Sequence, residues 1–119
     1  MRSEWIQHKG RRILFSNLTH LTLDELRAEI KASDELILRE AKNSVLYLAD
    51  LAGTLGSPAV IDIFSKSGAL TKSYVRRTAV IGVSGVRKTL VDIVIKLTGV
   101  QVMVFGSLEE AKDGLVNAK

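Results

Sequence analysis

The residues best suited to chemistry form a glycine-rich turn, Gly82-Val-Ser-Gly85, between a predicted strand and a predicted helix. A nucleophile elbow needs Gly-x-Ser-x-Gly, but position 86 is valine and no histidine follows to act as the base. A phosphate loop needs glycine directly before Lys88, where this chain has Arg87. Two readings stay open: an anion site at a helix N-terminus, or a tight turn that glycine permits. The candidate anion-binding residues are Ser84, Gly85, Arg87 and Lys88.

The other polar residues show no catalytic or metal-binding spacing. His8 and His20 lie apart in the chain without the His-x-x-x-His pattern, so no metal site is predicted. Asp50 follows a predicted central strand, where open α/β sheets place functional groups, yet it has no neighbouring acid or base. We therefore predict no catalytic residue, no cofactor and no enzymatic activity.

Alternating apolar strands and amphipathic helices are expected to position these residues. A strand at 12–15, with 5–8 as its candidate partner, precedes a helix that starts with a capping box at Thr22 and ends near Asn43. Strands at 45–49, 78–83 and 101–105 then alternate with three helices. Those helices start at Ser57-Pro58, at Val86 and at Ser107. Repeated strand–helix–strand units predict an α/β fold with a largely parallel sheet.

The helix predicted at 86–97 carries more apolar residues than packing on one sheet requires. Lys88, Asp92 and Lys96 form a single polar strip because they are four residues apart, and most other positions are apolar. A helix that packs on one surface needs an apolar stripe only about 100° wide. Burial between neighbouring elements explains the excess, or a partner does; we predict a homodimer. The candidate interface residues are Leu90, Val91, Val94 and Ile95.

Length and composition favour one globular domain over residues 1–119, with a core at about 11–116. A chain of 119 residues with 46% hydrophobic and 25% charged residues is too apolar for a disordered segment. Charged residues interrupt every apolar stretch, so no transmembrane segment is expected. Residues 1–12 lack the apolar centre of a secretory signal, and the chain has no cysteine. These features predict a cytoplasmic protein.

The net charge of +4 does not indicate a nucleic-acid site. The 17 lysines and arginines are scattered along the chain. The aromatic residues are not interleaved with them, as they are in proteins that bind single strands by stacking. We therefore predict no nucleic-acid partner.

Three segments carry a resemblance to a known family. They are Ser44-Val-Leu-Tyr-Leu-Ala-Asp50-Leu-Ala-Gly53-Thr54, Thr78-Ala-Val-Ile-Gly-Val-Ser-Gly85 and Gln101-Val-Met-Val-Phe105-Gly-Ser-Leu-Glu-Glu110-Ala111. Through them the chain resembles the STAS superfamily, and most closely its SpoIIAA-like branch of small bacterial proteins, over residues 11–116. The resemblance implies a mixed sheet packed with helices in the order β-β-α-β-α-β-α-β-α. The chain also looks like the CRAL-TRIO-type lipid-carrier domains grouped with this branch.

The resemblance also implies a phosphorylation switch. In the anti-sigma-factor antagonists of the superfamily, a serine in an Asp-Ser-Ser-Gly-type turn before the second helix is phosphorylated to change partner binding. The matching stretch here runs from Asp50 to Pro58 and has no acidic residue directly before its serine. Ser57 is the nearest match by position and Thr54 the second.

Two functions are predicted from the residues and the resemblance together. The first is a non-catalytic regulatory or protein-interaction module with an unidentified protein partner, switched near Thr54 and Ser57. The alternative is a small carrier that binds an apolar, lipid-like ligand or an anionic ligand between helix and sheet.

Overall fold

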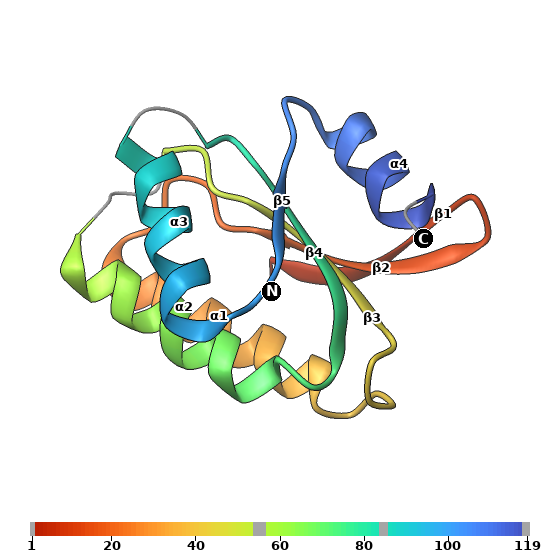
Figure 1. Ribbon diagram of the computed structural model, residues 1–119, viewed down its shortest axis with the longest axis horizontal. Helices are drawn as coiled ribbons and strands as arrows, with labels where there is room; N and C mark the ends of the chain where they lie inside the picture. Colours follow the sequence, from red (N-terminus) through yellow and green to blue (C-terminus); the bar gives the residue numbers. More distant parts are fainter. Residues whose placement is uncertain (1, 54–56, 84–85, 118–119) are drawn as a thin grey trace.

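The computed structural model describes residues 2–53, 57–83 and 86–117, in which strands and helices alternate along most of the chain (Figure 1). The elements are β1 (Ser3–His8), β2 (Arg11–Asn17), α1 (Leu23–Ile37), β3 (Val45–Asp50), α2 (Pro58–Thr71), β4 (Val75–Ile81), α3 (Val86–Thr98), β5 (Val102–Val104) and α4 (Leu108–Asn117).

The strands form one mixed sheet in the order β1-β2-β3-β4-β5. β1 and β2 are an antiparallel hairpin, and every other neighbouring pair is parallel. The hairpin turns at Lys9 and Gly10, which both have positive φ, at 50° and 79°. Such turns suit the right-handed twist of the strands they join. The prediction of an α/β fold with a mixed, mostly parallel sheet is therefore confirmed.

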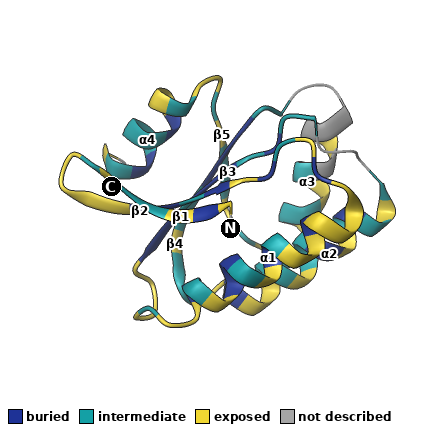
Figure 2. Ribbon diagram, turned by 180° about the vertical axis from the view of Figure 1, so that it is seen from behind, coloured by how far each residue is buried: buried dark blue, intermediate teal, exposed yellow. Residues whose placement is uncertain are grey.

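Helices α1, α2 and α3 cover one face of the sheet, and α4 covers the other (Figure 1). Successive side chains of a strand point to opposite faces. Ala49 of β3 accordingly belongs to a buried cluster with Leu26 of α1 and Val60 of α2, whereas Leu48 belongs to a cluster with Leu115 of α4. Figure 2 shows the buried residues along the central strands and the inner sides of the helices. The solid apolar runs of the central strands follow from this coverage of both faces.

Helix α1 is shorter than its sequence pattern predicts. The capping box is present, with Glu25 N–H donating to Thr22 Oγ1 at 3.2 Å and Thr22 N–H donating to Glu25 Oε1 at 3.0 Å. The helix ends at Ile37, however, and not near Asn43. Asn43 has a φ of 56° and its N–H donates to Ser73 O at 2.9 Å. Asn43 therefore turns the chain into β3, and that tertiary contact overrides the helical pattern of residues 38–42.

The ends of α2 and α3 follow their local sequence signals. Ser57 caps α2, its Oγ accepting the Val60 N–H at 3.3 Å, and Pro58 takes the first helical position. Gly99 ends α3 with a φ of 71°, and its N–H donates to Ile95 O at 2.8 Å. The C-terminal end of α3 is therefore set by Gly99.

A polar contact joins the first hairpin to α4 across the sheet. Asp113 Oδ1 lies 2.7 Å from His8 Nε2 and 3.0 Å from Lys9 Nζ. The hydrogen bond with His8, followed by that with Lys9, lowers the pKa of the Asp113 carboxyl. His8 lies in β1 with 15% of its side chain exposed.

Candidate functional site

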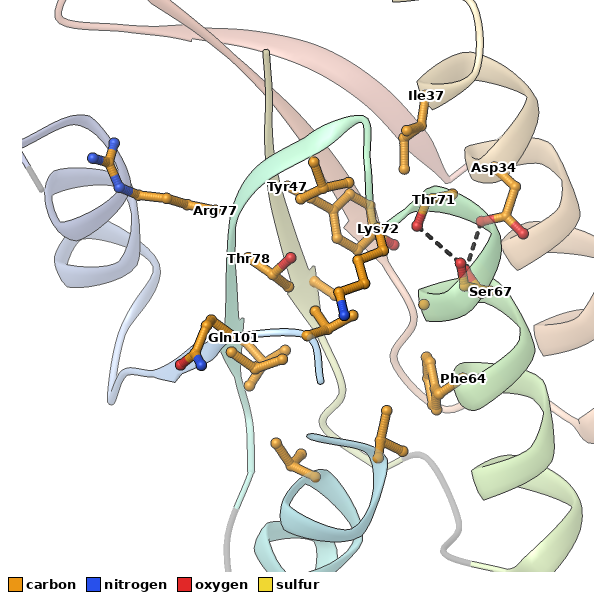
Figure 3. A pocket seen from close by; sticks show the side chains of 18 of the residues that line it. Asp34, Ile37, Tyr47, Phe64, Ser67, Thr71, Lys72, Arg77, Thr78 and Gln101 are labelled. Atoms are coloured by element: carbon orange, nitrogen blue, oxygen red, sulfur yellow. Dashed lines mark hydrogen bonds between the residues drawn. The ribbon is translucent and has the colours of Figure 1, made fainter. Parts of the chain in front are cut away.

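An apolar cavity of about 300 Å³ lies between the sheet and helices α2 and α3 (Figure 3). The sheet contributes Val80 of β4 and Val102 of β5, α2 contributes Phe64, and α3 contributes Val91 and Val94. The volume is at the lower end of the range for small-molecule sites. It equals the liquid volume of about ten water molecules.

The cavity exists because α3 packs on α2 more closely than on the sheet. The valines at 91 and 94 turn toward the sheet without filling the space above Val80 and Val102. The α3–β5 connection forms part of the wall at one end, where Gly99 and Val100 line the cavity. The cavity is therefore a consequence of how the third strand–helix–strand unit docks.

A pair of polar side chains interrupts the apolar wall. Ser67 Oγ of α2 donates to Asp34 Oδ1 of α1 at 2.6 Å, and Thr71 Oγ1 donates to Ser67 O at 2.9 Å (Figure 3). Asp34 has only 8% of its surface exposed. Burial raises the pKa of the Asp34 carboxyl, and the hydrogen bond from Ser67 opposes the shift. The carboxyl is thus held by α2 and takes up a proton more readily than an exposed aspartate does.

Tyr47 of β3 lines the cavity beside this pair. Its Oη is buried and has no hydrogen-bond partner among the described residues. Burial raises the pKa of Tyr47 to about 12, while the nearby hydroxyls of Ser16 and Ser33 act in the opposite direction. Tyr47 therefore stays a neutral phenol, whose ring forms part of the cavity wall.

Asp34→Asn is expected to make stability less dependent on pH. Because the folded pKa of Asp34 is raised above 3.8, the folded protein binds this proton more tightly than the unfolded chain does. The stability of the wild type therefore falls as the pH rises from 3.8 through the folded pKa. Urea midpoints are measured at about pH 3 and about pH 7. The stability of the variant relative to that of the wild type should be higher at the higher pH. An equal gain from Asp62→Asn, at an exposed position of α2, would contradict this origin.

The predicted anion site lies largely outside the described residues. Ser84 and Gly85 are not among them, and the side chains of Arg87 and Lys88 are not described, although their backbone belongs to α3. The anion site therefore stays a prediction. Of the predicted switch residues, Thr54 is outside the described ranges. Ser57 is half-buried at the start of α2, and its Oγ accepts the capping hydrogen bond from the Val60 N–H.

The predicted interface residues of α3 do not share an outer face. Val91 and Val94 line the cavity, Ile95 is half-buried, and the side chain of Leu90 is not described. Among the side chains of this helix that the structure describes, the exposed large apolar ones are instead Ile93, at 36%, and Leu97, at 67%. The homodimer itself stays a prediction, which light scattering at micromolar concentration checks.

Sequence reasoning missed Asp34 as a cavity residue, although a signal was present. Asp34 follows Ile30 by four residues and precedes Ile37 by three, so it lies on the buried face of α1. A carboxylate at such a position needs a partner or a raised pKa. Lys72 and Tyr47 had no comparable signal, because the contacts that bring them to the cavity come from distant segments.

Within residues 2–53, 57–83 and 86–117, no group of three or more histidine, aspartate and glutamate side chains could hold a metal ion. No helix in these ranges combines the length and the apolar character needed to cross a membrane. Comparison with protein-family models, with curated proteins and with solved structures finds no significant match.

Proposed function

We propose that this chain binds a small, mainly apolar ligand in the cavity between the sheet and helices α2 and α3. The observation that carries the proposal is the apolar space of about 300 Å³ in a chain of only 119 residues. Protein interiors are close-packed, and voids larger than a water molecule are few in a domain. Sites for small molecules are typically lined mainly by apolar side chains with a few polar groups, as this cavity is.

The polar groups of the cavity favour binding over catalysis. Asp34 is already paired with Ser67, and the Ser67 carbonyl accepts from Thr71. No histidine lines the cavity among the described residues, so neither serine nor threonine there has a general base of that kind. The proposal is therefore a ligand-binding, non-catalytic domain.

Val94→Phe is expected to abolish binding in the cavity. The larger ring occupies the space between α3 and the sheet, so the affinity for an eight-carbon alcohol should fall by at least about tenfold. Isothermal titration calorimetry with octan-1-ol measures this, and native mass spectrometry of the purified protein tests for a retained ligand. Ile93→Phe places the same ring on the exposed side of α3 and should leave the affinity unchanged. Equal affinities for Val94→Phe and the wild type would overturn the proposal.

A regulatory role through Ser57 is a second candidate function. It rests on two points. Ser57 is half-buried at the N-terminus of α2, which lines the cavity. The chain also resembles the SpoIIAA-like branch of the STAS superfamily. A phosphate there would be favoured by the helix dipole but would replace the Ser57 Oγ cap on Val60. Intact-mass and phosphopeptide measurements on protein from its own host test it; an unmodified chain under all growth conditions would reject the switch.

A further inference from the structure

The ionisable residues that line the cavity are unbalanced in charge. Lys72, Arg76 and Arg77 are cations, and Asp34 is the carboxylate found among the described lining residues. Arg77 is directed away from the cavity, where its Nη1 donates to Leu115 O at 3.5 Å (Figure 3). Lys72 and Arg76 remain, and both are exposed. The cavity therefore reaches the surface at an end that carries positive charge.

Lys72 is placed to contact a molecule in the cavity. It follows the last residue of α2, and Figure 3 shows its side chain extending across the pocket. Its Nζ donates to Thr98 O at 3.1 Å, at the C-terminal end of α3. An ammonium has three donors, so this bond leaves two for a ligand.

The Lys72 ammonium lies close to Gly99, at the end of α3. A Cβ at Gly99 would lie 2.9 Å from Lys72 Nζ, a contact that a small movement of this flexible side chain would relieve. Gly99 is needed for its φ of 71°, which ends α3. Lys72 is held at the cavity by its hydrogen bond to Thr98 O.

Asp34 does not cancel this positive charge. Its oxygen is bonded to Ser67 within the wall, on the side of the cavity formed by α1 and α2. The charge available to a ligand at the open end is that of Lys72 and Arg76.

We propose that the ligand carries an anionic head group on an apolar tail, with the tail in the cavity and the head paired with Lys72 Nζ. This inference rests on the proposed function and names its ligand class. A tail of about ten non-hydrogen atoms has roughly the volume of the cavity.

Isothermal titration calorimetry with three probes of one tail length tests the inference: octanoate, octyl phosphate and octan-1-ol. The wild type should bind at least one of the two anions about fivefold more tightly than the alcohol. Lys72→Met should remove that preference and leave the affinity for the alcohol unchanged. Lys66→Met removes the same charge from the exposed side of α2 and should preserve the preference.

The outcomes separate this inference from the proposed function. Equal affinity of the wild type for the alcohol and both anions would overturn the head-group assignment but leave the cavity as a binding site. An anion preference that survives in Lys72→Met would also overturn the assignment. Binding of none of the three probes would overturn the proposed function itself. The preference should weaken as salt is added, because Lys72 is exposed.

Discussion

Leu48→Ala is expected to lower the free energy of unfolding by about 2–5 kcal/mol. Leu48 has no exposed surface and lies on β3, on the sheet face covered by α4. Its neighbours there include Ile13 of β2, Ala79 of β4 and Leu115 of α4. Strands on either side of β3 are hydrogen-bonded to it and cannot move in to fill the space. The substitution therefore removes buried apolar surface and leaves a cavity.

Urea unfolding followed by far-ultraviolet circular dichroism measures this loss. Leu70→Ala is the matched control, since Leu70 of α2 is 53% exposed and its truncation should change stability by less than about 0.5 kcal/mol. Equal losses at the two positions would show that α4 and the sheet do not pack as described. Helix α4 is the helix that covers this face of the sheet among the described residues. A loss of unfolding free energy in Leu48→Ala therefore also tests whether α4 packs on the sheet.

Gly82→Ala is expected to destabilise the protein by about 2–4 kcal/mol, for two additive reasons. Gly82 follows β4 with a φ of 73°, a conformation that costs an alanine about 1–2 kcal/mol. A Cβ there would also lie 2.6 Å from Ala52 N and 2.8 Å from Asp50 Oδ1. Asp50 Oδ1 accepts the Ala52 N–H at 3.1 Å, so the methyl group would displace a hydrogen-bonded turn.

Gly10→Ala separates the two causes. Gly10 has nearly the same φ, 79°, but nothing lies within 4 Å of its Cβ position. It should lose only the conformational part, about 1–2 kcal/mol. Chemical denaturation measures the loss of unfolding free energy in each variant. The loss in Gly82→Ala minus the loss in Gly10→Ala is the part caused by steric overlap beside Asp50. Identical losses would mean that the turns after β3 and β4 are not in contact.

The cavity does not lie where open α/β sheets usually bind ligands. Open α/β sheets commonly bind ligands outside the carboxyl ends of their strands, which here is the side of Gly82 and Asp50. The cavity instead lies over the sheet beneath α3, and its charged end is at Lys72, before β4. A ligand there would contact both helices that follow β3 and β4.

The sequence by itself determined the features that depend on neighbours along the chain. Thr22 and Glu25 form their capping box, Ser57 and Pro58 start α2, and Gly99 ends α3, as the residue types predict. Each of these involves groups no more than four residues apart. The alternation of apolar runs and amphipathic segments likewise sufficed for the α/β class, because strand and helix have different periods.

Tertiary structure decided what depends on distant partners. Asn43 binds Ser73, so α1 stops early; Asp34 meets Ser67, 33 residues away; and His8 meets Asp113, 105 residues away. The same holds for α3, which is apolar on most of its sides. Its one polar strip marks an outer side, but the wide apolar remainder does not decide which apolar face meets the sheet. Docking on α2 set that face, turned Val91 and Val94 toward the sheet, and left the cavity beneath them.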